Sequence, residues 1–283
     1  MPIADVRSTR AALLRRLLPD DEPGGLVVRQ GQFHTVVMGA DRVVCLARTR
    51  AAAARLPQRA VVLRAVGGLG LGVRTPEPLV EGEGYLVLRR VPGEPLEPGV
   101  LDDAEVAGVV AAEYAALLAG LARAGGEEAA RAVLPVAPVG QWRRFAGGVR
   151  AELFGLMSDS GRRRAERELA GAEALPHLTG AVVHGDLGSE NVLWEWTDGR
   201  PRLSGVLDWD GVALGDPAED LAAVAAGHGP EILERVRAVD RWTDPGLTGR
   251  IAAIRGTFAL QQALAAVRDG DDEELADGLA GYR

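Results

Sequence analysis

Apolar and polar residues alternate along much of the first ninety positions, and this alternation predicts half-buried β-strands. Residues 26–39 and 41–48 are two such stretches, and the Gly and Asp between their apolar cores suit a turn. A further strand is predicted within residues 84–90, whereas residues 50–66 carry their large apolar side chains near helical spacing. The pattern therefore predicts a small β-rich lobe that contains one helix.

The pattern changes after residues 92–99, which hold three prolines and two glycines and predict a linker. Apolar residues then follow helical spacing, first in a helix that Asp102 or Asp103 can cap and again over residues 142–156. Helices are also expected over the Arg- and Glu-rich segment that follows and from residue 217 to residue 268. We therefore divide the chain into an N-terminal lobe, residues 1–91, and a larger, mainly helical C-terminal lobe, residues 92–283.

One pair of strands is expected inside the helical lobe. Residues 191–196 and 202–209 are apolar runs, and Asp198-Gly199 between them favours a tight hairpin turn. The fold class is thus α+β, with two lobes. Ligand sites favour interfaces between such lobes.

Composition narrows the classes of function. The formal net charge is −8, which argues against a nucleic-acid partner or an anionic membrane surface and favours a cationic small molecule. No run approaches the ~18 apolar residues that span a bilayer, and no signal peptide is recognised. A single cysteine, Cys45, excludes an internal disulfide and fits a reducing compartment. We therefore expect a cytoplasmic protein without an obligate protein partner.

Four polar residues have the spacing of a phosphoryl-transfer site. His184, Asp186 and Asn191 form the pattern H-G-D-x-x-x-x-N, and Asp208 follows after the predicted hairpin. Phosphoryl transfer needs a carboxylate near the acceptor hydroxyl, and it needs an amide oxygen and a second carboxylate to hold Mg²⁺ against nucleotide phosphates. The interval from Asp186 to Asn191 is that of the kinase catalytic loop. The alternative is a polar turn followed by a solvated strand end, but the combined pattern favours catalysis.

With HGDLGSEN, LDWD and GDPAEDLA, and with GQFH and VPGEPL nearer the N-terminus, the chain resembles the aminoglycoside phosphotransferase family, small-molecule relatives of protein kinases. The resemblance covers nearly the whole chain. It implies a protein-kinase-like fold with ATP and Mg²⁺ as cofactors and an N-terminal lobe that binds the nucleotide. Within the family, the stretch after GQFH and the C-terminal tail are most similar to the tuberactinomycin phosphotransferases, which phosphorylate a hydroxyl of viomycin or capreomycin.

The resemblance also implies roles for individual residues. Asp186 corresponds to the base and His184 to the residue that shapes the loop, while Asn191 and Asp208 correspond to the metal ligands. Asp216 and Asp220 are expected to act as helix cap and loop anchor. The residues expected near the nucleotide are Gly31, Phe33 and His34 in the turn over the phosphates, and Arg89 and Val91 before the linker.

The sequence departs from the kinase pattern at the phosphate anchor, where a strand lysine usually pairs with a helix glutamate. All 32 basic residues are arginine, Cys45 occupies the strand position, and Arg59 lies near the helix position. Either the protein binds nucleotide without catalysis, or a guanidinium supplies the missing charge, since its donors match phosphate oxygens. The intact set of Asp186, Asn191 and Asp208 favours an active enzyme, with Arg59 as the first candidate cation and Arg48 as the second.

The predicted acceptor is cationic. Tuberactinomycins are cyclic peptides with guanidine and amine groups, and we expect Glu190, Asp210 and Asp269 to contact them. Asp271, Asp272, Glu273 and Glu274 follow Asp269, although acidic residues also suit the start of a helix. The alternatives are a kinase for an aminoglycoside, a sugar or an amino alcohol, and a nucleotide-binding protein without catalysis.

Overall fold

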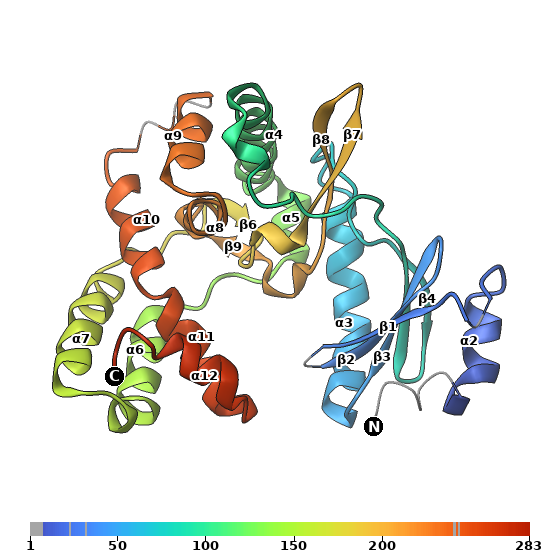
Figure 1. Ribbon diagram of the computed structural model, residues 1–283, viewed down its shortest axis with the longest axis horizontal. Helices are drawn as coiled ribbons and strands as arrows, with labels where there is room; N and C mark the ends of the chain where they lie inside the picture. The colour runs from blue at the N-terminus through green and yellow to red at the C-terminus, as the bar shows by residue number, and fades with distance from the viewer. Residues whose placement is uncertain (1–7, 23, 32, 240–241, 243) are drawn as a thin grey trace. The chain divides into compact units, whose positions relative to one another are not determined.

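The computed structural model describes residues 8–22, 24–31, 33–239, 242 and 244–283 (Figure 1). Gln32 of the GQFH motif and the first seven residues of the N-terminal segment lie outside these ranges. The chain folds as two compact units: unit 1 comprises residues 1–113, 127–134 and 190–211, and unit 2 comprises residues 114–126, 135–189 and 212–283. The predicted lobe boundary at residue 92 stays a prediction.

Unit 1 contains a five-stranded antiparallel sheet with the order β1-β2-β3-β5-β4. Its strands are β1 (Val27–Gln30), β2 (His34–Met38), β3 (Arg42–Ala47), β4 (Pro78–Gly82) and β5 (Tyr85–Arg89). In β3 the register sets Cys45 opposite Val36 of β2 and Leu86 of β5. Cys45 therefore lies on a central strand with a neighbour on each side.

Two helices pack with this sheet. Helix α2 (Ala11–Leu17) contributes Leu14 and Leu17 to an apolar core that includes Val37 and Val44 of the sheet. Helix α3 (Arg50–Gly67) begins where Thr49 Oγ1 accepts a hydrogen bond from the N–H of Ala52. Its buried residues recur every three or four positions, as expected for one helix face: Ala52, Leu56, Ala60, Leu63 and Val66. This burial fixes which residues of α3 point away from the sheet.

The predicted hairpin is also part of unit 1. Strands β7 (Val192–Thr197) and β8 (Arg200–Val206) pair antiparallel, and both turn residues have positive φ, 51° at Asp198 and 77° at Gly199. These angles suit the tight turn whose twist matches a hairpin. The predicted linker is bound to the hairpin, since Trp194 N–H donates to the carbonyl of Glu94 at 2.8 Å.

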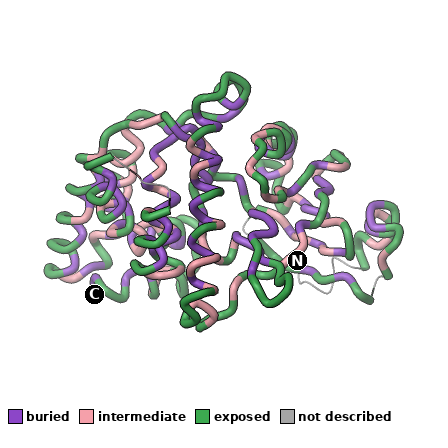
Figure 2. The backbone as a smooth tube through the Cα atoms, turned by 90° about the horizontal axis from the view of Figure 1, so that it is seen from above, coloured by how far each residue is buried: buried purple, intermediate pink, exposed green. Residues whose placement is uncertain are grey.

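Unit 2 is mainly helical. Its helices are α6 (Gln141–Glu152), α7 (Asp159–Glu173), α8 (Ala218–His228), α9 (Pro230–Val239), α10 (Leu247–Gly256), α11 (Phe258–Asp269) and α12 (Asp272–Gly278). Residues of α6, α7 and α11 and the C-terminal tail form one apolar core, and buried and exposed stretches alternate along the helices (Figure 2). Two short strands, β6 (Ala181–Val183) and β9 (Ala213–Gly215), pair antiparallel. The HGD motif starts directly after β6.

Helices α4 (Ala104–Ala124) and α5 (Glu128–Val133) are the remaining helices of the described residues, which also form the short 3-10 turns η1 (Val100–Asp102), η2 (Phe154–Leu156), η3 (Ser189–Asn191) and η4 (Trp209–Gly211). Among the described residues, α4 is long and apolar enough to cross a membrane by length and composition, but half of its most apolar window is buried inside the protein. A core helix gives the same signal, so this one is weak evidence for a membrane span.

A buried carboxylate holds the backbone of the HGD loop. Asp220 of α8 is 1% exposed, and its two oxygens accept hydrogen bonds from the N–H groups of His184 at 2.8 Å and Gly185 at 3.0 Å. Asp216 accepts from the N–H of Ala218 and pairs with Arg250 at 2.6 Å. The predicted loop anchor is confirmed at Asp220, whereas the N-cap position of α8 is Pro217 and Asp216 precedes it.

Several local predictions are confirmed and others are wrong. Helix α3 and the hairpin lie where the sequence placed them, and Asp103 Oδ1 accepts from the N–H of Glu105 at the start of α4. The sequence did not predict α2 or β4. The expected helix over residues 250–268 is two helices, α10 and α11, interrupted at Thr257, whose hydroxyl donates to the carbonyl of Ile254.

The C-terminal tail depends on a glycine in α7. Tyr282 is 1% exposed and its carbonyl accepts from the N–H of Ser158, while a Cβ at Gly161 would collide with the backbone of Tyr282. We expect Gly161→Ala to lower the free energy of unfolding by about 1–3 kcal/mol because of overpacking. Gly147→Ala in α6 faces open space and is the control, with a gain of about 0.5–1 kcal/mol from reduced chain entropy. Urea unfolding of both variants checks this, and equal effects would contradict it.

The loop anchor gives a second prediction. Asp220→Ala leaves the N–H groups of His184 and Gly185 without their acceptor, and each unsatisfied donor costs about 1–3 kcal/mol. We therefore expect the free energy of unfolding to fall by about 2–4 kcal/mol, and Asp220→Asn to recover part of the loss through its amide oxygen. Asp277→Ala, at an exposed position of α12, is the control. A urea midpoint for Asp220→Ala equal to that of the control would refute the anchor.

Candidate functional site

The two predicted metal ligands lie at the open end of the β7–β8 hairpin. Asn191 ends the turn η3 directly before β7, and its carbonyl accepts from the N–H of Leu207 at 2.8 Å. Asp208 follows Leu207, so hairpin pairing brings both residues to the same end. Asp208 has a φ of 54°, a left-handed conformation that few residue types other than glycine tolerate. Such backbone outliers cluster at functional sites.

Arg59 reaches this end of the hairpin from α3. Its Nε lies 2.7 Å from Asp210 Oδ1 and its Nη2 lies 3.9 Å from Asp208 Oδ1. Its Nη1 lies 3.4 Å from His34 Nδ1. Only 18% of the Arg59 side chain is exposed, whereas the Asp208 side chain is 52% exposed. The structure thus brings together three residues of the predicted nucleotide and metal site, and it adds Asp210 to them.

Cys45 faces the same cluster. The thiol is buried, and burial raises its pKa, while the nearby positive charge of Arg59 opposes this shift. Cys45 is therefore neutral and the adjacent charge comes from Arg59. Burial also lowers the pKa of His34, and the positive charge of Arg59 acts in the same direction.

The turn before β2 carries the other predicted phosphate-site residues. Gly31 N–H donates to the carbonyl of His34 at 2.9 Å, and the Gly31 carbonyl accepts from Arg48 Nη1 at 2.7 Å. Phe33 is 43% exposed, and the guanidinium of Arg55 lies 5.6 Å from its ring centroid. Arg48 therefore binds the turn itself, which leaves Arg59 as the cation next to the carboxylates.

Arg89 and Val91 precede the proline-rich segment as expected. Arg89 ends β5 and pairs with Glu77 at 2.7 Å, which raises the pKa of its guanidinium. Val91 is 7% exposed and its side chain packs against Gly205 of β8.

The HGD loop belongs to unit 2. His184 is fully buried and its Nδ1 accepts from the N–H of Asp186 at 3.2 Å, so the imidazole shapes the loop. Gly185 has a φ of 82°, which a residue with a Cβ rarely adopts. Asp186 is exposed and the next residue, Leu187, is 1% exposed. The buried side chains of His184 and Leu187 therefore hold the loop, and Asp186 between them lies in an exposed position.

The residues predicted to contact the acceptor are spread over the chain. Glu190 is exposed in η3, Asp210 pairs with Arg59, and Asp269 ends α11 in an exposed position. The acidic residues after Asp269 have a structural function, since Asp271 Oδ1 accepts from the N–H groups of Glu273 and Glu274 at the start of α12. The geometry thus supports the helix-start explanation for these acids.

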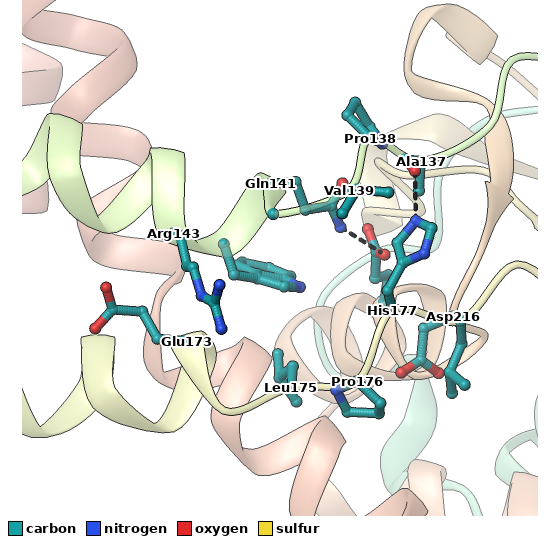
Figure 3. Close-up of a pocket in the computed structure, with 14 residues that line it drawn as sticks. Ala137, Pro138, Val139, Gln141, Arg143, Glu173, Leu175, Pro176, His177 and Asp216 are labelled. Atoms are coloured by element: carbon teal, nitrogen blue, oxygen red, sulfur yellow. Dashed lines mark hydrogen bonds between the residues drawn. The ribbon is translucent and has the colours of Figure 1, made fainter.

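Unit 2 also contains a cavity of about 230 Å³ that the sequence did not reveal. Residues 137–143 and 173–178 line opposite sides, and Asp216 and Glu219 of the α8 region complete it (Figure 3). Gln141 Nε2 donates to Glu219 Oε1 at 3.3 Å. Burial, followed by the negative charge of Asp220, raises the pKa of Glu219 to about 7. The GDPAED motif could have indicated these paired carboxylates, but not the cavity beside them.

The described residues fit a magnesium–nucleotide group better than a metal bound by the protein alone. No group of three or more His, Cys, Asp or Glu side chains among them could hold a metal ion. Magnesium is usually bound by one or two protein oxygens together with water and substrate phosphates, as Asn191 and Asp208 would allow. In the described part of the chain, the buried His34 Nε2 has no hydrogen-bond partner, and a phosphate oxygen would supply one.

Comparison with known proteins relates the sequence to a family. Residues 23–268 match the model of the phosphotransferase enzyme family. The chain is 65% identical over 282 residues to a viomycin phosphotransferase of Streptomyces vinaceus, covering 97% of this chain and 98% of that protein.

Solved structures confirm the fold class. The GDP and kanamycin complex of APH(2")-IIia superimposes with a TM-score of 0.82 at 18% identity, covering 96% of each chain. A macrolide 2'-phosphotransferase type I gives a TM-score of 0.72 at 24% identity, covering 97% of each chain. The predicted bilobal, kinase-like α+β fold is therefore correct, with a β-sheet in the N-terminal part and helices in the C-terminal part. From the match over most of its length, the chain belongs to the phosphotransferase enzyme family.

Proposed function

We propose that this protein is an ATP-dependent O-phosphotransferase that inactivates a tuberactinomycin antibiotic, viomycin or capreomycin, by phosphorylating a hydroxyl. The observation that carries the proposal is the 65% identity to a viomycin phosphotransferase over 97% of the chain. The acidic net charge of −8 also suits a cationic acceptor. The single cysteine fits a reducing compartment, so we place the enzyme in the cytoplasm.

The proposed roles follow from the contacts of each residue. Asp186, exposed on a loop that His184 and Asp220 hold, accepts or orients the proton of the acceptor hydroxyl. Asn191 and Asp208, at one end of the hairpin, hold Mg²⁺. When bound, the ion neutralises charge on the nucleotide phosphates.

Arg59 anchors the phosphates in place of the absent lysine. Its guanidinium lies beside the neutral Cys45 and close to Asp208, where a strand lysine would otherwise direct its charge. Gly31, Phe33 and His34 cover the phosphates, and Arg89 and Val91 lie next to the nucleotide base. Glu190 and Asp269 are proposed contacts for the cationic acceptor.

A single assay tests the function. The purified protein with ATP and Mg²⁺ should release ADP when viomycin or capreomycin is added, because those acceptors pair cationic groups with a reactive hydroxyl. The same assay with kanamycin, a neutral sugar and an amino alcohol provides the comparison, and mass spectrometry should show one added phosphoryl group on the antibiotic. ADP release with a sugar alone would indicate the general small-molecule kinase. Nucleotide binding without release for every acceptor would indicate a protein without catalysis.

The role of Asp186 has its own test. Asp186→Asn should lower kcat by about 10²–10⁴-fold, since the amide cannot accept the hydroxyl proton. ATP affinity, measured by calorimetry, should change little because the carboxylate faces the acceptor. Asp198→Asn is a matched control, since this exposed turn residue has a φ of 51° that asparagine also tolerates. Near-normal turnover in Asp186→Asn would remove the residue from the mechanism.

A further inference from the structure

The environment of Arg59 differs from that of the other paired arginines described in unit 1. Its side chain is 18% exposed, whereas those of Arg64, Arg74, Arg89 and Arg200 are 51%, 59%, 61% and 69% exposed. Exposed ion pairs contribute little because water screens them, and burial strengthens the coupling. Among these ion-paired arginines, Arg59 is therefore the one whose charge is least screened by water.

Two carboxylates approach Arg59, and they are not equivalent. Asp210 Oδ1 lies 2.7 Å from Nε, but Asp208 Oδ1 lies 3.9 Å from Nη2. The nearer group is the one that the sequence assigned to the acceptor. Because the contact with Asp208 is longer and this side chain is half exposed, its carboxylate oxygens can still bind a metal ion.

The turn η4 explains how both carboxylates reach the same guanidinium. Trp209 between them is 1% exposed, and its Nε1–H donates to the carbonyl of Val206 at 2.9 Å. This anchor holds the turn against the hairpin, and α3 packs against η4. Asp210 is thus placed by its buried neighbour Trp209 and by the packing of α3 on η4, and its position does not depend on an acceptor.

The guanidinium keeps donor capacity in this position. The buried Nε has no aligned hydrogen bond, so its contact with Asp210 is an ion pair, and the buried His34 Nε2 also lacks a partner among the described residues. A guanidinium has five N–H donors in a fixed plane. Asp210 therefore orients the cation electrostatically while donors remain for an anion.

Building on the function proposed above, we propose that Asp210 is the positioning residue of Arg59 and that this pair performs with reversed polarity the task of a strand lysine and a helix glutamate. The cation is on the helix, the strand position is the neutral Cys45, and the anion is on the turn after the metal ligand. Asp210 then acts on the nucleotide through Arg59 and does not contact the acceptor.

A double-mutant cycle on ADP binding without Mg²⁺ tests this assignment, with calorimetry as the readout. Asp210→Asn and Arg59→Ala should each weaken ADP binding by about tenfold, and the double variant should be little worse than Arg59→Ala, because contacting residues are not additive. Asp210→Glu should recover part of the affinity. Arg64→Ala, on the same helix but paired with Glu81 and exposed, is the matched control and should leave ADP binding unchanged.

Steady-state kinetics add a second criterion. Asp210→Asn should raise KM for ATP and leave KM for viomycin unchanged. A selective rise in KM for viomycin, or full additivity in the cycle, would overturn the assignment and return Asp210 to the acceptor site. Thermal unfolding of each variant shows that it is folded, and a folded Asp210→Asn with unchanged ADP affinity also overturns the assignment. Failure of the wild-type protein to bind ADP would instead refute the proposed function.

Discussion

The register of the β7–β8 hairpin is the constraint on which the proposed metal site depends. Asp198 and Gly199 adopt the positive φ values of a tight turn, and a β-bulge at Leu193/Trp194 then shifts the register before the far end of the hairpin. At the far end, the bond from Leu207 to the carbonyl of Asn191 closes the ladder one residue before Asp208. A shift by one residue would turn Asp208 to the opposite face and separate the two oxygen donors. The hairpin thus brings Asn191 and Asp208 to the same end, although many residues separate them in the sequence.

The end of the hairpin that carries Asp208 is also where a positive charge could bind phosphate. A chain without lysine has arginine guanidinium groups as its permanently charged side chains for phosphate. Strand β3 carries the small, neutral Cys45, and the longer side chain of Arg59 enters from α3. Arginine is more weakly hydrated than lysine and binds oxygen pairs through a rigid fork, so it tolerates this partly buried position. The proposed phosphate anchor and the proposed metal site then share one electrostatic cluster.

In unit 2, buried carboxylates play a structural part. Asp220 is stabilised by two backbone N–H groups and Asp216 by Arg250, so neither is a buried charge without partners. Glu219 accepts a hydrogen bond from the neutral amide of Gln141, and burial, followed by the negative charge of Asp220, raises its pKa to about 7. The chain therefore supports its HGD loop on a dense group of acids, of which Glu219 has a raised pKa.

The sequence by itself determined the features that depend on near neighbours: α3, the hairpin and its turn, the cap at Asp103, and the spacing that marks Asp186, Asn191 and Asp208. Alternation and turn chemistry encode these features, because each residue interacts with others a few positions away. The family and the kinase-like fold also followed from motifs of this kind. The short helix α2, the strand β4 and the break at Thr257 did not follow, because contacts with distant parts of the fold outweigh their weak local signals.

Only the tertiary structure decided which side chains of distant segments contact each other. Asp210 was expected at the acceptor, and it lies against Arg59 because the packing of α3 on η4 sets which side chains meet. The acids after Asp269 were a potential binding surface, and Asp271 caps α12. Periodicity states which face of a helix is buried, but not which turn of a distant segment lies opposite it. That choice depends on how buried side chains fill space together, and no local pattern in the chain records it.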